Sequence, residues 1–237
     1  PPVGGNSIDF AENPYEAGST SNNIIGMDIG DVDNDGDLDV VTSELSPDKH
    51  IKIWKNPGTN IWGSWTYQKV GTPNEYTRNP DFGDVDGDGD LDILSVHNDK
   101  KILLWKNDGT PWDGTWTSYE VGSRSVKMVE GEFGDLDNDG DLDVITADWG
   151  RPTSYVYIWK NKGNPWDGSS NWVGYSIGSV GAYIDGLKLG DIDKDGYIDI
   201  VTGDWARDGS DTPDIYIFKN PGGSGVWGSW TTKKKVG

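Results

Sequence analysis

The sequence predicts an all-β fold, and three observations lead to this prediction. A unit of just over fifty residues repeats four times along the 237-residue chain. Each unit contains short runs of β-branched and aromatic residues bounded by Gly, Asn, Asp and Pro, a pattern typical of strands. No long helical pattern is present, and the 34 Gly and 12 Pro indicate frequent turns.

The first element of each unit is an acidic loop, which reads Gly-Asp-Val-Asp-Asn-Asp-Gly-Asp-Leu-Asp in the first copy. Its leading Asp residues are 53, 51 and 56 residues apart, so the four copies are in register with the longer repeat. The loops span residues 30–39, 83–92, 134–143 and 190–199.

The strands follow the loop in a constant order. A β-branched run leads to a second apolar run that ends in Trp-Lys-Asn or Phe-Lys-Asn, and a turn with paired Trp leads to a polar strand that ends in Val-Gly or Ile-Gly. With the strand that enters the loop, each unit offers about four strands. A twisted four-stranded sheet repeated at this period describes the blade of a β-propeller.

Two other architectures explain the repeat less well. The repeats of a β-solenoid are usually much shorter, and fifty residues without disulfides form a weak independent core. We therefore predict a β-propeller domain over residues 24–237, with repeats of about 24–71, 72–122, 123–178 and 179–237.

The N-terminal stretch, residues 1–23, remains after four units are counted, and we interpret it as an extension or an extra strand. Ser7-Ile8-Asp9-Phe10 is a candidate outer strand for a neighbouring blade. Such a strand would close the ring, or it would add to a sheet edge of another subunit and drive self-association. The competing interpretation is a disordered or loosely docked terminus.

The net charge limits the partners. The chain has 40 Asp and Glu against 20 Lys and Arg, which gives a formal charge of −20. Nucleic acid and anionic membranes both need clustered positive charge, so neither is expected as a partner. No apolar run approaches the roughly 18 residues of a membrane span, and we predict no membrane insertion. The 13 Trp and 10 Tyr argue against disorder.

The acidic loops predict a calcium site in each repeat. Carboxylates stand at loop positions 1, 3, 5 and 9, and a Gly at position 6 allows a tight turn that folds the oxygens around one point. Hard oxygen ligands in this number select Ca²⁺, about four ions in the whole chain. Position 7 is expected to contribute a main-chain carbonyl. The predicted ligands are Asp31, Asp33, Asp35, Asp37 and Asp39; Asp84, Asp86, Asp88, Asp90 and Asp92; Asp135, Asp137, Asp139, Asp141 and Asp143; and Asp191, Asp193, Asp195, Tyr197 and Asp199.

The loops differ from an EF-hand, which places a bidentate Glu at position 12. That position holds Thr42, Ser95, Thr146 and Thr202 here, and the flanks are predicted strands. The alternative is an ordinary Asp-Gly turn. Four or five carboxylates within nine residues repel one another unless a cation lies between them, and the pattern occurs four times. We expect the calcium to be structural rather than regulatory.

These residues resemble the FG-GAP/VCBS repeats of integrin-α-like β-propellers and of many secreted bacterial and archaeal proteins. The segment Asp81–Asp92 and its three near copies carry the resemblance, which covers about residues 24–237. It implies a calcium-loaded propeller that works outside the cell in adhesion, recognition or as an accessory domain. Related propellers commonly have seven blades and this chain supplies four, so a small ring, a fragment and a ring completed by a second chain all remain open.

The Trp residues suggest a second kind of site. Most recur once per repeat, which indicates packing between sheets. Asp148-Trp149 and Asp204-Trp205 occur only in the third and fourth repeats. An acidic residue beside a Trp can bind a sugar by hydrogen bonding and stacking, and we take these four residues as candidate ligand contacts. Ordinary loop variation is the competing interpretation.

Catalysis is not expected. The two histidines, His50 and His97, stand at non-equivalent positions without a nucleophile elbow or a phosphate-binding loop. The predicted function is a non-enzymatic, extracellular, calcium-stabilised module for binding, adhesion or surface assembly, with a protein or glycan partner on a cell surface or in the matrix. The alternatives are a carbohydrate-binding propeller, an accessory domain of a secreted carbohydrate-active enzyme, and a calcium-responsive switch.

Overall fold

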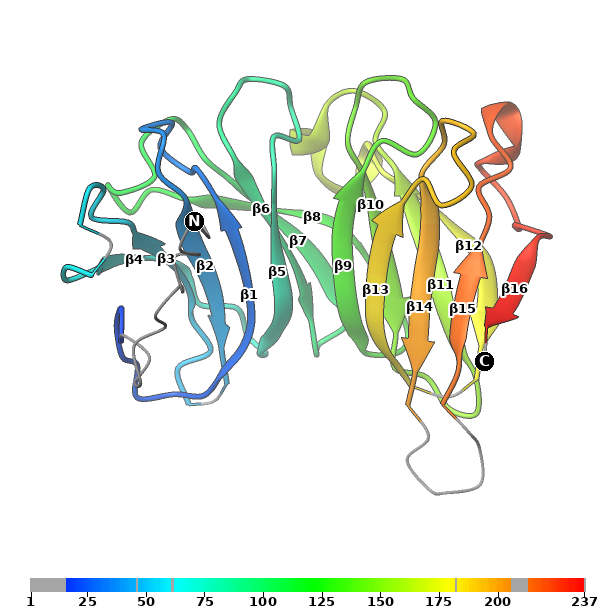
Figure 1. Ribbon diagram of the computed structural model, residues 1–237, viewed down its shortest axis with the longest axis horizontal. Helices are drawn as coiled ribbons and strands as arrows, with labels where there is room; N and C mark the ends of the chain where they lie inside the picture. Colours follow the sequence, from blue (N-terminus) through cyan, green and yellow to red (C-terminus); the bar gives the residue numbers. More distant parts are fainter. Residues whose placement is uncertain (1–15, 46, 61, 182, 206–212, 237) are drawn as a thin grey trace, which may run out of the picture.

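The computed structural model describes residues 16–45, 47–60, 62–181, 183–205 and 213–236, and it confirms the predicted all-β class (Figure 1). The strands form four separate antiparallel sheets of four strands each, here called blades 1 to 4. Ser7–Phe10 lies outside the described residues. The strands are β1 (Ile24–Gly30), β2 (Asp39–Glu44), β3 (Ile51–Lys55) and β4 (Thr66–Gly71) in blade 1; β5 (Thr77–Gly83), β6 (Asp92–His97), β7 (Lys101–Lys106) and β8 (Thr117–Ser123) in blade 2; β9 (Met128–Gly134), β10 (Asp143–Asp148), β11 (Ser154–Lys160) and β12 (Val173–Val180) in blade 3; and β13 (Ile184–Gly190), β14 (Asp199–Asp204), β15 (Ile215–Phe218) and β16 (Lys233–Val236) in blade 4.

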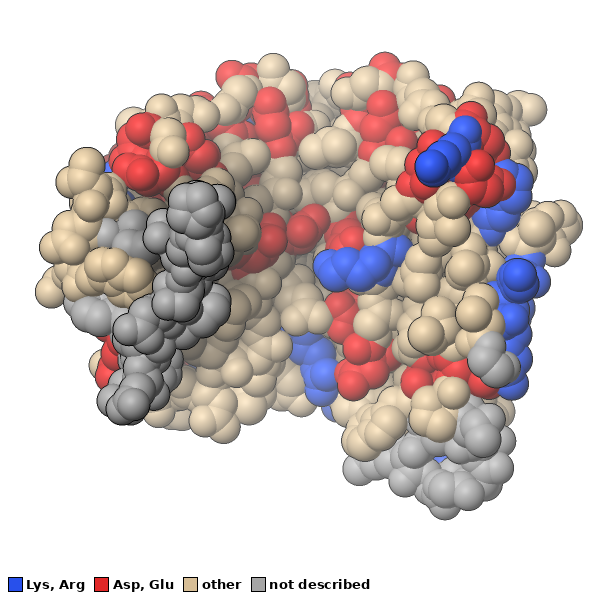
Figure 2. Space-filling view, viewed as in Figure 1, with Lys and Arg blue, Asp and Glu red and all other residues tan. Residues whose placement is uncertain are grey.

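Each acidic loop joins the first two strands of its blade. The Gly before the loop pairs with the last Asp of the loop, as Gly30 does with Asp39 and Gly83 with Asp92. The loop is therefore a hairpin whose ends are held by the sheet ladder. Acidic side chains gather at this end of the blades (Figure 2).

The blades stand in a row, with blade 1 at one end and blade 4 at the other (Figure 1). The first strand of each blade lies beside the first strand of the next, β1 beside β5, β5 beside β9 and β9 beside β13. Two short 3₁₀ turns, η1 (Pro165–Ser170) and η2 (Gly223–Gly225), lie in the turns that carry the paired Trp. Within the described residues no helix is long and apolar enough to cross a membrane.

The hydrophobic core lies between the blades. Each of the three buried clusters combines residues of two neighbouring blades. Val144 packs toward blade 2 and the next residue, Ile145, packs toward blade 4, because successive side chains of a strand point to opposite faces. An interior blade is thus covered on both faces, which explains the continuous apolar runs in its second and third strands.

Candidate functional site

Three carboxylates converge in every acidic loop, from positions 1, 3 and 9. One oxygen of each lies within 4.8 Å of the other two, which is close enough to hold one metal ion. The four clusters, one per blade, are Asp31, Asp33 and Asp39; Asp84, Asp86 and Asp92; Asp135, Asp137 and Asp143; and Asp191, Asp193 and Asp199.

The loop backbone wraps around the first Asp. In blade 1, Asp31 Oδ1 accepts a hydrogen bond from the Asp35 amide at 3.0 Å, and Oδ2 accepts one from the Gly36 amide at 2.9 Å. Gly36 has a φ of +93°, in the left-handed region that a Gly adopts without strain. The Gly at position 6 is therefore required by the turn that brings the carboxylates together.

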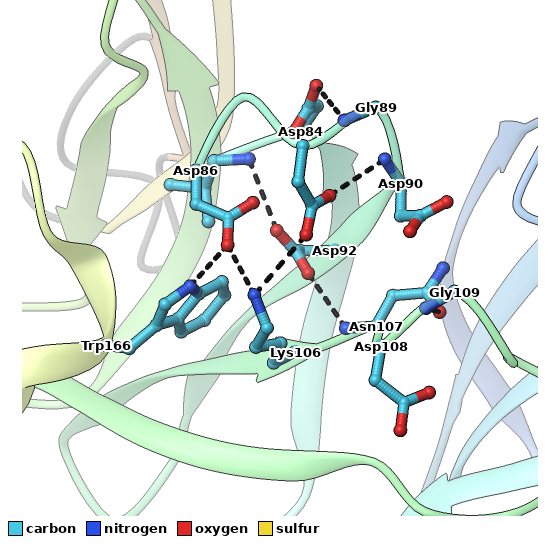
Figure 3. Close-up of polar contacts among 12 residues, drawn as sticks. Asp84, Asp86, Gly89, Asp90, Asp92, Lys106, Asn107, Asp108, Gly109 and Trp166 are labelled. Carbon is cyan, nitrogen blue, oxygen red and sulfur yellow. Dashed lines mark hydrogen bonds and ion pairs between the residues drawn. The ribbon is translucent and has the colours of Figure 1, made fainter.

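The ninth Asp is the buried member of each cluster. Asp92 is fully buried; its Oδ1 accepts a hydrogen bond from the Asn107 amide at 2.8 Å and its Oδ2 accepts one from the Val85 amide at 3.3 Å (Figure 3). Burial raises the pKa of Asp92 to about 8, and it raises the pKa of Asp143 to about 7 and of Asp39 to about 6. A cation at the cluster would oppose this effect, because an opposite charge favours the ionised carboxylate.

A lysine from the third strand lies beside the third and fifth positions. In blade 2, Lys106 Nζ pairs with Asp86 and lies 3.5 Å from Asp88 Oδ2 (Figure 3). Burial raises the pKa of Asp86, but the hydrogen bonds from Lys106 and Trp166 outweigh it and hold that pKa below its ordinary value. Lys55, Lys160 and Lys219 make the same pairs in the other blades. The ammonium balances part of the loop charge.

The clusters fit a hard cation. Five buried carboxylate oxygens have no hydrogen-bond partner among the described residues, and four of them belong to loop positions 1 or 3. An unsatisfied buried acceptor is costly, and a bound cation removes the cost. Several carboxylate oxygens around one point are the donor set of Ca²⁺. The four oxygens are Asp33 Oδ1, Asp84 Oδ1, Asp86 Oδ1 and Asp137 Oδ1.

The fifth and seventh positions lie outside the three-carboxylate clusters. The fifth Asp accepts the amide of the seventh residue, at 3.0 Å in each blade, and also pairs with the lysine. Asp90 at position 7 accepts a hydrogen bond from Asn34 of blade 1 at 3.1 Å. The main-chain carbonyl ligand proposed for Asp37, Asp90, Asp141 and Tyr197 stays a prediction.

The sequence did not reveal that the next blade contacts the acidic loop of blades 1, 2 and 3. Trp166, in the turn of blade 3, donates its indole N–H to Asp86 Oδ2 in the loop of blade 2 at 2.5 Å. Trp112 and Trp227 make the same bond to Asp33 and Asp137. We expected these Trp residues to serve packing alone. Their recurrence in register with the loops was the available signal, but it could not show that they reach the loop of a different repeat.

The Trp of the third strand combines packing with a hydrogen bond. Trp105 packs against Gly71 of blade 1, where an added Cβ would lie 2.1 Å from the ring. Its indole donates to Ser95 Oγ at 2.8 Å. The residue at loop position 12 is therefore a hydroxyl acceptor for this indole, which explains why Thr or Ser stands there and not Glu.

The candidate ligand pairs differ in exposure. Asp148 is fully buried and accepts the Tyr155 amide at 2.9 Å, and burial raises its pKa. Trp149 lies under the Arg78 guanidinium, 4.6 Å from the ring centre. Asp204 accepts the Asp214 amide at 2.6 Å. Trp205 is the exposed member of the four.

The four first strands, together with β14 and β15 of blade 4, line a cavity of about 520 Å³. Asp81 and Glu130 lie in its wall, and burial raises the pKa of each to about 7. Lys188 pairs with Glu132 there. Asp81 Oδ2 also accepts the Phe133 amide of the next blade at 2.8 Å, so part of this acidity joins blades.

Comparison with known proteins agrees with this architecture. The FG-GAP-like repeat model matches residues 31–95, 84–146 and 135–202, and so covers most of the chain. No curated protein matches the chain. A solved structure described as "Structure of Dos1 propeller" is similar with a TM-score of 0.62 and 11% identity over 91% of this chain. The match covers 47% of that propeller chain, so this chain spans about half its length. Four antiparallel blades, a matching repeat model and a propeller neighbour establish that the chain belongs to the FG-GAP-like repeat family and has the fold of a β-propeller.

Proposed function

We propose that this chain is a calcium-stabilised, non-enzymatic binding module that works outside the cell. The observation that carries the proposal is the set of four Asp clusters, in three of which a buried loop oxygen lacks a hydrogen-bond donor. A bound Ca²⁺ would supply the positive charge that these oxygens lack. Asp at positions 1, 3 and 9 would hold the ion, with position 5 as a further candidate.

A structural role for the cation follows from the connections of the loop. The ninth Asp begins the second strand and accepts the amide that follows the third strand, as Asp92 does from Asn107. The third Asp accepts the indole of the next blade, as Asp86 does from Trp166. Neutralising the cluster therefore steadies both the hairpin within one blade and the boundary between two blades.

Binding outside the cell is supported by the family. FG-GAP-like repeats are typical of extracellular proteins, and a propeller of this kind suggests a binding or adhesion module. Extracellular calcium modules bind at about 10⁻⁴–10⁻³ M. The proposed partner is a protein or a glycan on a cell surface or in the matrix. The net charge of −20 disfavours nucleic acid as a partner.

A non-enzymatic role agrees with the environment of His97. Its Nδ1 lies 3.1 Å from Thr77 Oγ1 and its Nε2 lies 2.7 Å from Ser95 Oγ, and the side chain is buried. Ser95 in turn accepts the Trp105 indole. Both ring nitrogens therefore serve the packing of blade 2.

Calcium titration tests the metal sites. Calorimetry on EDTA-treated protein is expected to show four bound Ca²⁺, one per cluster. The melting temperature should fall when EDTA is added and recover with excess Ca²⁺, whereas Mg²⁺ at the same concentration should restore less. Asp92→Asn is expected to remove one site of the four. An unchanged melting temperature in EDTA would contradict the proposal.

Binding is tested on arrays. The labelled chain, with Ca²⁺ and with EDTA, is applied to immobilised glycans and to immobilised matrix proteins. We expect calcium-dependent binding to one of the two classes. Loss of glycan binding in Trp205→Ala would identify the carbohydrate-binding alternative, and binding to neither class would overturn the proposed module.

A further inference from the structure

One lysine of every blade lies against the acidic loop of the same blade, and we call these four residues the loop lysines. Three of them end the third strand of their blade, and the fourth directly follows β15. Each ammonium pairs with the carboxylates at loop positions 3 and 5, and its distance to the fifth Asp is 3.0, 3.5, 2.9 and 2.5 Å in blades 1 to 4. The pairing is therefore a feature of the repeat. The loop lysines are Lys55, Lys106, Lys160 and Lys219.

The fifth carboxylate is fully engaged by these contacts. In blade 2, Asp88 Oδ1 accepts the Asp90 amide at 3.0 Å and Asp88 Oδ2 faces the Lys106 ammonium. Asp35 of blade 1 is held in the same way, by an amide on one oxygen and by Lys55 on the other. The fifth Asp is also the carboxylate that stays outside the cluster formed by positions 1, 3 and 9. Its second oxygen becomes available to a cation only when the lysine leaves it.

The third carboxylate is divided differently. Asp86 Oδ2 accepts both Lys106 and the Trp166 indole, whereas Asp86 Oδ1 is buried and has no partner among the described residues (Figure 3). Asp33 and Asp137 show the same division. The third Asp can therefore bind a cation through Oδ1 while Oδ2 keeps its donors. The lysine restricts the fifth position and leaves the third one available.

The next blade holds the loop lysine in this place. The Lys106 ammonium lies 4.5 Å from the ring centre of Trp166, and the corresponding distances for Lys55 and Lys160 are 5.1 and 4.4 Å. A cation within about 6 Å of a Trp face is attracted by the ring. Each of these ammonium groups is thus fixed between two carboxylates and an aromatic ring, which a loosely paired surface lysine is not.

We propose that the loop lysine competes with calcium for the fifth carboxylate. The inference rests on the proposed function, because it assumes that the clusters bind Ca²⁺. Without a divalent cation the loop carboxylates repel one another, and the ammonium reduces this repulsion. With the lysine in place the cation meets three carboxylates instead of four, and calcium affinity depends on the charge of the ligand set. The lysine therefore stabilises the calcium-free loop and lowers the calcium affinity of the site.

Lys106→Met tests both halves of the proposal in one loop. In EDTA the denaturant midpoint should fall, because the loop carboxylates lose their balancing charge. In calorimetry one of the calcium sites should bind about tenfold more tightly, because Asp88 is released to the cation. A lysine that only stabilised the fold would lower both quantities when removed. An unchanged or weaker calcium affinity would overturn the proposal, and Lys160→Met repeats the test in blade 3 if the first variant does not fold.

A second background separates competition for the fifth carboxylate from plain charge repulsion. In Asp88→Asn the fourth carboxylate is absent, so the additional Lys106→Met substitution should raise calcium affinity much less than it does in the wild type. An equal gain in both backgrounds would show that the lysine acts through its charge alone and would overturn the proposal.

Lys101→Met is the matched control, because Lys101 belongs to the same strand, β7, and carries the same charge. Its ammonium pairs with Glu120 at 2.7 Å and its side chain is 45% exposed. Exposed pairs contribute little, so neither the midpoint in EDTA nor the calcium affinity should change. Absence of calcium binding in the wild type would overturn the proposed function together with this inference. Four calcium sites with no gain in Lys106→Met would overturn this inference alone.

Discussion

Trp166 of blade 3 donates its indole N–H to Asp86 in the acidic loop of blade 2, over 2.5 Å. The two residues are 80 positions apart in the chain, and the bond links a candidate metal ligand to the neighbouring blade. The Lys106 ammonium lies over the same indole ring, 4.5 Å from its centre, and pairs with the same carboxylate. These contacts connect the acidic loop of blade 2, its balancing lysine and the boundary with blade 3.

Trp166→Phe keeps most of the packing of the ring and removes this donor. We expect the free energy of unfolding in excess Ca²⁺ to fall by about 1.5–3 kcal/mol, because the lost bond is made to a charged group. One of the calcium sites should also weaken. Denaturant unfolding and calcium titration measure the two effects.

Trp116→Phe is the matched control for this prediction. Its indole donates to the neutral Pro111 carbonyl at 3.0 Å, within the same turn. The expected loss is about 0.5–1.5 kcal/mol, with the calcium affinities unchanged. Equal effects of the two substitutions on calcium binding would contradict the link between Trp166 and the loop.

Loop position 12 provides a paired test of hydrogen bonding. Thr146 Oγ1 accepts the Trp159 indole at 3.0 Å, whereas the buried Thr202 hydroxyl has no partner among the described residues because Phe218 stands where the other blades have Trp. Thr146→Val is expected to cost about 1–3 kcal/mol by leaving a buried donor unsatisfied. Thr202→Val should be neutral or stabilising. A comparable loss in both variants would contradict this explanation.

His97 makes the stability sensitive to mild acid. Burial lowers its pKa to about 4 from an ordinary value of 6.5. Below pH 6.5 His97 is protonated in the unfolded chain but stays neutral in the folded chain. The free energy of unfolding therefore decreases as the pH falls from 6.5 toward 4. Between pH 7 and pH 5 the loss is about 2 kcal/mol.

His97→Asn removes this contribution and serves as the reference. The free energy of unfolding of each protein is measured at pH 7 and at pH 5 in the same excess of Ca²⁺. Its decrease between the two pH values should be about 2 kcal/mol smaller in the variant than in the wild type. The comparison cancels the pH dependence of the carboxylates and of calcium binding, which both proteins share. Identical pH dependence of the two proteins would show that folding does not lower the pKa of His97.

The sequence by itself determined the repeat, the class of fold and the composition of each loop. These follow from local rules, because Gly is needed where Gly36 turns the loop, and alternation along a strand places Val144 and Ile145 on opposite faces. The pattern of candidate metal ligands is also local, since positions 1, 3 and 9 lie within one hairpin. The fourfold recurrence of the pattern favoured a cation site over an ordinary Asp-Gly turn.

The tertiary structure decided what happens between repeats. That Trp166 reaches Asp86, and that Asn107 reaches Val32, depends on how one twisted sheet stacks on the next, and no local rule specifies the partner of a side chain across that boundary. It also showed that Ile29 and Ile215, apolar residues like their equivalents, are left exposed at the two ends of the row. Whether an apolar side chain is buried depends on the element packed against it as well as on the residue itself. Only the arrangement of the blades shows which of these side chains are covered.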